Sequence, residues 1–580
     1  SCCLCAVGAG ILTRYKVHSM LCHMIRTRSW VVPAARRSAK QKAFLCLSCG
    51  STRSLTHSST NKEQLADANR RQLCSVSVHE ESPSKNSEGC PFTGSKTPPK
   101  LKQVPTLPFV GSMWSQYSGT PPFDPATMYS YQHEMSDKFG EFYTVGFPGF
   151  GAGLHGTIYS IMDPDEMLKV IRKEGAYPSG LVQKGMFFIQ ALKDDKSPMF
   201  NDEDLGVLGQ GESWKRQRTF LQTGMLDPKS ANNFLPGIQK AAQLASKAAP
   251  GNYDDLNRYL NYCAFDMFSS FMFGELTQCA GNDVPENDEN IRFCKAAIEA
   301  MELVTKMGRS PYQLFLHKLG IKSKEYQDFK GEWDAVREIA MKKLHAFIER
   351  YERDELNEIE RASYFANALD RLPTSDVTKE EMLEICTFAL FVAVDTTSGV
   401  TGWNLVHLAL NPDVQEKLHK ELSRAAADTG GKLTAQALDR KTSPFLHAVV
   451  RENYRLTPPF PGVTSKSNSQ GEVDIHDVTL PKDSLISLGN PWSNTRYLPD
   501  AREFKPERWL KEAVEARKGT DLEVMDHALF RDSFGQGARR CPGSRVATNE
   551  VLSMLAQLVL DYEIVSPVNT LDEIKYDMSA

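Results

Sequence analysis

The sequence predicts a mainly α-helical protein with a small β region. Apolar residues recur at helical spacing in residues 229–350, where one stripe comprises Trp333, Val336, Ala340, Leu344, Phe347 and Tyr351. A capping box of Thr378 and Glu381 begins a further long helix, whose apolar residues continue towards Leu410. Two short runs, residues 141–145 and 157–162, have the composition of strands. These observations predict a helical core and one small region of strands.

The composition excludes some classes of protein. The chain has 580 residues, of which 41% are hydrophobic and 24% charged, and its formal net charge is −4. Such a composition is typical of soluble globular proteins and lacks the basic excess of a nucleic-acid binder. By length alone, about four ordinary domains are expected. The cysteines after residue 62 are scattered and indicate no disulfide framework, which fits a reducing compartment.

The N-terminal segment differs from the remainder of the chain. Residues 1–62 contain no Asp or Glu, whereas Arg, Lys, Ser and Thr are frequent, and this predicts a cleavable organelle transit peptide. A basic tail without a targeting role is the alternative. An endoplasmic reticulum anchor would need residues upstream of Ser1, because the apolar run stops at Arg14. Residues 63–97 are polar and aperiodic, which predicts a disordered linker before a folded region at 98–580.

Residues 534–543, which we call the cysteine loop, carry the strongest chemical pattern. Gly535, Gly537 and Gly543 allow positive φ angles and close approach of the backbone to a flat group. Pro542 is a good first residue for a helix, and apolar residues at helical spacing follow it. Cys541 is therefore expected at a helix N-terminus, where a thiolate is favoured. A glycine-rich turn with a structural cysteine is the alternative.

The cysteine loop resembles the haem-thiolate signature of the cytochrome P450 family, Phe-x-x-Gly-x-Arg-x-Cys-x-Gly. The matching residues are Phe534, Gly537, Arg539, Cys541 and Gly543. The resemblance spans roughly residues 98–580, and it implies one haem domain with the haem between a long central helix and this loop. Cys541 would ligate the iron of protoporphyrin IX, and Arg539 would hold a propionate. Family members usually continue into a last strand pair, so the C-terminus at Ala580 is expected to be truncated.

Other motifs of the family occur in the expected order. Trp214 and Arg218 lie four residues apart on one helical face and resemble the family's Trp-x-x-x-Arg contact with a haem propionate. Lys466 follows a proline-rich turn and would add a further contact with the haem. Glu452, Arg455 and Arg508 resemble a structural network that fixes the segment before the cysteine loop. Residues 170–178 resemble a segment typical of the mitochondrial branch of the family.

The long helix carries polar residues where a helix does not favour them. Asp395 and Thr396 interrupt an apolar run, and neither residue type is a good choice in the middle of a helix. The pair resembles the oxygen-binding segment of the family, in which Thr396 would hold dioxygen by a hydrogen bond and Asp395 would relay protons. One departure is Ala393, which replaces the usual glycine but is small enough to leave room for oxygen. A locally bonded polar step in a buried helix is the alternative.

The resemblance implies a monooxygenase that inserts one atom of O2 into an apolar C–H bond. Lipophilic or sterol-like molecules are the usual substrates of the mitochondrial branch, and the expected pocket wall includes Phe388, Val392 and Phe460. Two rivals are a haem-thiolate isomerase or dehydratase and a non-enzymatic haem sensor. The isomerases often lack the threonine or lengthen the cysteine loop, and a sensor would not need Asp395 and Thr396.

The presequence and the family resemblance together predict the electron donor. In mitochondria the donor would be a small acidic ferredoxin that docks on a basic face near the cysteine side of the haem. His447, Arg451 and Arg545 match basic positions of that face, while Ser544 replaces a usual arginine. We therefore expect a mitochondrial enzyme associated peripherally with the inner membrane. A flavoprotein reductase at the endoplasmic reticulum membrane is the alternative.

Overall fold

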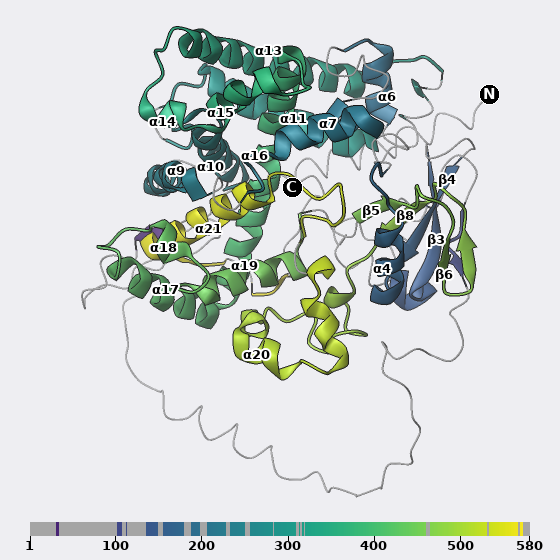
Figure 1. Cartoon of the computed structure of the whole chain (residues 1–580). Coiled ribbons are helices and arrows are strands. Elements are labelled where there is room, and N and C mark those ends of the chain that lie inside the picture. The colour runs from purple at the N-terminus through teal and green to yellow at the C-terminus, as the bar shows by residue number, and fades with distance from the viewer. Residues whose placement is uncertain are drawn as a thin grey trace, which may run out of the picture.

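The structure is a computed structural model. It describes residues 31–33, 101–106, 112, 135–148, 155–178, 187–197, 206–227, 232–249, 256–281, 284–308, 313, 316–317, 319–459, 464–530, 533–566 and 569–571. The predicted linker, most of the predicted transit peptide and Phe460 lie outside these residues. Helices form most of the molecule, and the main sheet and the pair of β6 (Val473–Ile475) and β7 (Val478–Leu480) lie on one side of it (Figure 1). The predicted fold class, mainly α with a small β region, is confirmed.

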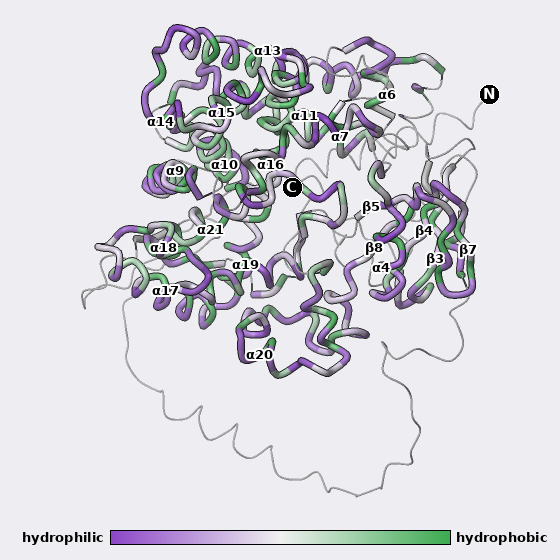
Figure 2. Tube along the Cα trace, in the orientation of Figure 1, coloured by the Kyte–Doolittle hydropathy of each residue, from purple (hydrophilic) through white to green (hydrophobic). Residues whose placement is uncertain are grey.

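The helices have the following bounds. The longer ones are α4 (Pro164–Arg172), α6 (Phe187–Asp194), α7 (Gly211–Gln222), α9 (Leu235–Ala248), α10 (Leu256–Phe273), α11 (Glu289–Gly308), α13 (Lys324–Glu352), α15 (Tyr364–Arg371), α16 (Lys379–Leu410), α17 (Pro412–Ala427), α19 (Pro444–Leu456) and α21 (Ser544–Asp561). Shorter ones are α14 (Glu358–Arg361), α18 (Ala435–Leu438) and α20 (Lys511–Ala516). In Figure 2, peripheral helices such as α17 alternate between hydrophilic and hydrophobic residues, as helices with one buried face do.

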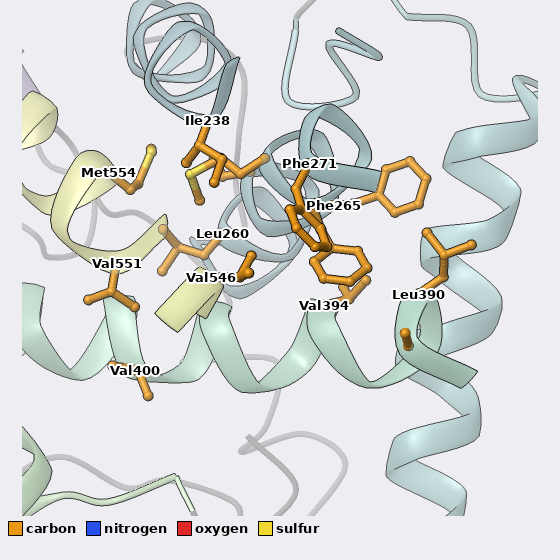
Figure 3. Close-up of a cluster of buried hydrophobic side chains, with 14 of the residues drawn as sticks. Ile238, Leu260, Phe265, Phe271, Leu390, Val394, Val400, Val546, Val551 and Met554 are labelled. Atoms are coloured by element: carbon orange, nitrogen blue, oxygen red, sulfur yellow. The ribbon is translucent and has the colours of Figure 1, made fainter. Parts of the chain in front are cut away.

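Helix α16 is the central element of the helical region. The predicted capping box begins it, because the Thr378 hydroxyl accepts a hydrogen bond from the Glu381 amide and the Glu381 carboxylate accepts one from the Thr378 amide. By length and composition α16 could cross a membrane, but most of its apolar stretch is buried inside the protein. Figure 3 shows Leu390 and Val394 of α16 in one cluster with Phe265 and Phe271 of α10. Burial of each such side chain contributes about 1.5–3 kcal/mol, so packing fixes the position of α16.

The strands form one main sheet and two small pairs. The main sheet has the order β2 (Lys102–Gln103), β3 (Phe142–Pro148), β4 (His155–Ile161), β8 (Leu485–Leu488) and β5 (Thr464–Ser467). β6 (Val473–Ile475) pairs with β7 (Val478–Leu480). β1 (Val31–Pro33), which lies within the predicted transit peptide, pairs with β9 (Tyr562–Ile564). The two predicted strands at 141–145 and 157–162 correspond to β3 and β4, which are longer and end at different residues.

The cysteine loop leads into α21, but the helix begins later than expected. The sequence predicts Pro542 as its first residue, whereas α21 begins at Ser544 with Gly543 as the N-terminal cap. The physical reason is the loop itself, because the Cys541 amide donates a hydrogen bond to the Phe534 carbonyl at 2.9 Å. That bond keeps Cys541 in the loop and delays the first helical turn.

Candidate active site

The cysteine loop is a closed turn with Cys541 at its edge. Gly535 and Gly537 have φ angles of +75° and +76°, which L side chains rarely adopt. The Phe534 ring packs edge-on against the Tyr454 ring of α19, with 5.4 Å between the ring centroids. Cys541 is half-buried and is not part of a disulfide. Positive φ angles and ring packing thus fix the loop, and Cys541 is partly exposed at its edge.

Helix α7 brings its two predicted residues next to this loop. Trp214 is buried, and the guanidinium carbon of Arg539 lies 4.3 Å from the centre of its ring, which is a cation–π contact. Arg218 donates a hydrogen bond to the carbonyl of Arg540. Burial lowers the pKa of Arg218, and the neighbouring Cys541 opposes that shift. The structure therefore gathers Trp214, Arg218 and Arg539 beside Cys541.

Lys466 reaches the same place from strand β5, with a partner that sequence reasoning missed. Its ammonium lies 2.9 Å from the Glu174 carboxylate and also donates to the carbonyl of Gln536 in the cysteine loop. Burial raises the pKa of Glu174, and Lys466 opposes the shift. Burial likewise lowers the pKa of Lys466. Glu174 stands just after α4, and its position in the chain gives no sign that it would meet the loop.

The charges at this site fit a haem. Arg218, Lys466 and Arg539 are three cations, and Glu174 is the one carboxylate among them, which leaves a surplus of two positive charges. A haem carries two propionates. Burial lowers the pKa of Arg539 to about 10, so its charge persists at neutral pH. The Oε2 atom of Glu174 has no hydrogen-bond partner among the described residues, so this buried site is not saturated.

Asp395 and Thr396 lie in the middle of α16 as predicted, each half-buried. The Thr396 hydroxyl donates to the Val392 carbonyl at 3.0 Å, and the Ser398 hydroxyl donates to the Asp395 carbonyl at 2.8 Å. Burial raises the pKa of Asp395 to about 6, and Glu302 of α11 adds to the shift. The carboxyl group can therefore gain and lose a proton near neutral pH. Phe388, Val392 and Thr396 recur every four residues and share one face of the helix.

A buried contact that sequence reasoning missed joins α16 to the helix after Cys541. The Thr397 hydroxyl donates to the Glu550 carboxylate of α21 at 3.1 Å, and both residues are buried. Burial raises the pKa of Glu550 to about 8, so it is mainly protonated at neutral pH. Its other oxygen, Oε1, has no hydrogen-bond partner in the described part of the chain. This link fixes the helix with Asp395 and Thr396 relative to the cysteine loop.

The predicted Glu452 network is present behind the cysteine loop. Glu452 accepts two hydrogen bonds from Arg455, at 2.7 and 3.0 Å, and one from Arg508 at 3.0 Å. Trp509 and the backbone amide of Lys505, which the motif does not reveal, donate to the same carboxylate. The arginines lower the pKa of Glu452, although burial alone would raise it. The Glu452 carboxylate is thus fully hydrogen-bonded, and such a buried network holds the segment before the loop in a fixed position.

The predicted basic face needs two corrections. His447 is half-buried, burial lowers its pKa, and its Nε2 lies 2.8 Å from the Leu438 carbonyl, so it is not an exposed cation of this face. Arg451 is not an exposed charge at the edge of this face. Its guanidinium carbon lies 3.8 Å from the centre of the Trp509 ring, and its Nη2 lies 3.6 Å from Oδ1 of Asp526. Arg545 is exposed as expected.

The same face is hollowed. A hollow of about 480 Å³ lies between α19 and α21, and its lining includes the arginines Arg440, Arg451, Arg540 and Arg545. Arg440 was not part of the predicted face and is exposed. Phe534 also lines the hollow, so the hollow adjoins the cysteine loop.

Comparisons with known proteins match most of the chain. Residues 102–577 match the family described as Cytochrome P450. The chain is 25% identical to "Sterol 26-hydroxylase, mitochondrial" of Rattus norvegicus, over 68% of this chain and 72% of that protein. It is 25% identical to "1,25-dihydroxyvitamin D(3) 24-hydroxylase, mitochondrial" of Mus musculus, over 75% and 78%. It is also 26% identical to "2-hydroxyisoflavanone synthase" of Glycine max, over 63% and 70%.

Proposed function

The chain belongs to the cytochrome P450 family, and we propose that it hydroxylates a lipophilic, sterol-like substrate in mitochondria with electrons from a ferredoxin. The general activity, a haem-dependent monooxygenase, follows from the family and its named relatives. The observation that carries the finer proposal is the apolar face of Phe388 and Val392 next to Asp395 and Thr396 on α16. Relatives named as mitochondrial sterol and vitamin D hydroxylases support the substrate class and the compartment.

The residues of the cysteine loop would hold the cofactor. Bound haem supplies an iron centre at which O2 is reduced and one oxygen atom is inserted into a C–H bond. Cys541 would coordinate the iron as a thiolate, and Arg218, Lys466 and Arg539 would face the propionates, with Trp214 beneath Arg539. Phe534, Gly537 and Gly543 shape the loop. The Glu452 network would keep the loop in place, as outer contacts of a metal ligand do.

On the opposite side, Asp395 and Thr396 would deliver protons. The Asp395 carboxyl, with a pKa of about 6, can release a proton and be recharged from outside. The Thr396 hydroxyl would pass a proton onward after it rotates away from the Val392 carbonyl. These two residues argue against the rivals, since neither a haem sensor nor an isomerase requires a proton supply to oxygen.

The hollow beside α21 is our candidate docking site for the electron donor. Its exposed arginines, Arg440 and Arg545, suit a small acidic ferredoxin, and charges at such a rim mainly set the association rate. Peripheral association with the inner membrane remains part of the proposal. The basic composition of residues 1–62, which contain no Asp or Glu, supports the mitochondrial location.

The proposal is tested with the purified haem protein, a ferredoxin and its reductase, and a panel of sterols and other lipophiles. We expect NADPH and O2 consumption that depends on the ferredoxin, and a product heavier by one oxygen atom with at least one sterol-like compound. If a flavoprotein reductase alone supports turnover and ferredoxin does not, the mitochondrial assignment is wrong. If only small polar compounds are oxidised, the substrate class is wrong.

A further inference from the structure

Glu174 and Lys466 form a buried ion pair beneath the cysteine loop. The two side chains are 4% and 3% exposed, and 2.9 Å separates the ammonium from the nearer carboxylate oxygen. They come from distant parts of the chain, the end of α4 and strand β5. Such a pair is costly to desolvate, and removal of one member leaves the other as a buried charge without its partner. A role in fixing its surroundings would account for its presence.

Both members of the pair contact the loop itself. Lys466 donates to the carbonyl of Gln536. Glu174 Oε2 lies so close to Gly537 that a Cβ atom at position 537 would overlap it. Gly537 also has a positive φ angle, so an L side chain there would be strained and would in addition have to displace Glu174 Oε2. The pair therefore contacts two successive residues, Gln536 and Gly537, of the loop that carries Cys541.

The pair also belongs to the electrostatic surroundings of the haem site. Arg539 interacts electrostatically with both Glu174 and Lys466. The Glu174 carboxylate lies among the cations Arg218, Lys466 and Arg539, and it offsets part of the positive potential that would otherwise act on a bound haem. Charges buried in protein are screened weakly, so one charge here has a measurable effect on the site.

We propose that Glu174 is a positioning residue that holds Lys466 against the cysteine loop and lowers the reduction potential of the haem bound there. A negative charge near the iron disfavours the ferrous state, because that state carries one more electron. Lys466 acts in the opposite sense. The two charges balance each other, so the pair fixes the loop without a large net shift of the potential.

The test is a double-mutant cycle on the haem-loaded protein, with the ferric/ferrous reduction potential as the readout. Glu174→Gln keeps the shape of the side chain and removes its charge, and we expect it to favour reduction about tenfold, a rise of about 59 mV for one electron. Lys466→Met should shift the potential in the opposite direction. In the double variant the shifts should largely cancel, which single-site damage to the loop would not produce.

Glu166→Gln is the matched control. Glu166 is a buried carboxylate of α4 that pairs with Lys169 at 2.8 Å and does not contact the loop. We expect the haem in the Glu166→Gln protein to have the same reduction potential as the haem in the wild type. A Glu174→Gln protein with an unchanged potential would overturn the proposal.

If Glu174→Gln fails to retain haem, the double variant decides whether the proposal holds. Recovery of haem binding in Glu174→Gln/Lys466→Met supports the pair as one unit, and persistent loss overturns it. None of these measurements involves a substrate or a ferredoxin. Their failure therefore leaves the proposed hydroxylation intact, and failure of the hydroxylation assay leaves the role of Glu174 intact.

Discussion

In our proposal the cysteine loop and the centre of α16 form the two walls of the haem site, and different forces hold these two regions. The loop is fixed by charged contacts from distant elements, among them Lys466, Arg218 and, behind it, the Glu452 network. Asp395 and Thr396 instead lie in a helix whose own carbonyls accept the hydroxyls of Thr396 and Ser398. The comparison indicates that substitutions behind the loop lower the stability of the fold, whereas substitutions in the middle of α16 lower the rate of product formation.

The largest effect is expected behind the cysteine loop. Glu452→Ala leaves the buried Arg455 without its carboxylate and removes one of the two carboxylate partners of Arg508, and we expect the free energy of unfolding to fall by about 3–5 kcal/mol. Denaturant titration of the haem-loaded protein measures this change. The control is Glu507→Ala, which removes an exposed pair with Lys417 and should cost about 1 kcal/mol or less. Equal losses in the two variants would contradict a special role for the buried network.

A smaller loss of stability, with a larger loss of chemistry, is expected in α16. Thr396→Ala should keep haem and change the free energy of unfolding by about 1 kcal/mol or less, because the lost hydrogen bond is local. Product formation should fall about 10²-fold while electrons are diverted to hydrogen peroxide. Product and peroxide measured per NADPH consumed provide the readout. Unchanged coupling of electrons to product would rule out Thr396 as a proton donor.

The link between the two walls predicts a pH-dependent stability. The pKa of Glu550 is about 8 in the folded protein against an ordinary value of 4.5, so the folded protein keeps a proton that the unfolded chain loses. This contribution is fully present below pH 4.5 and is lost as pH rises through about 8. Between pH 4.5 and 8, the loss of this contribution lowers the free energy of unfolding by about 1.4 kcal/mol for each unit of pH increase. Glu550→Gln should flatten the dependence, and an unchanged slope in that variant would exclude Glu550 as its source.

The smallest effect is expected at the surface hollow. Arg545→Glu reverses one exposed charge without touching the loop or α16, so stability should stay within about 0.5 kcal/mol. Reduction by ferredoxin should slow severalfold, and high salt should slow the wild type in the same way. Stopped-flow reduction at two salt concentrations measures both. Arg353→Glu, an exposed residue of the α13 C-terminus, is the control and should leave the rate unchanged.

The sequence predicted what depends on local residue patterns. The cysteine loop, the capping box at Thr378, the Trp214–Arg218 face and the Glu452 motif are short strings whose spacing reflects one turn or one helical face. The structure places Trp214, Arg218, Arg539 and Lys466 at the cysteine loop, while their contacts with haem stay a prediction. Asp395 and Thr396 stand on α16 as expected, and their roles in proton delivery also stay predictions.

The contacts that sequence reasoning missed are long-range. Glu174 meets Lys466 across almost three hundred residues of chain, and Glu550 meets Thr397 between two helices, so no local spacing reveals either pair. The errors at His447 and Arg451 have the same origin. Helical spacing placed both on one face, but the neighbouring Leu438 carbonyl, Trp509 ring and Asp526 carboxylate decide whether that face is exposed.

The central claim is that Cys541 is the thiolate ligand at the end of the charge-stabilised loop. The most direct measurement is the absorption spectrum of the reduced, carbon monoxide-bound protein. We predict a strongly red-shifted Soret band in the wild type and in Cys386→Ser, which replaces a buried cysteine of α16. Cys541→Ser should lose that band while it retains the fold. A red-shifted band that survives in Cys541→Ser would contradict the account.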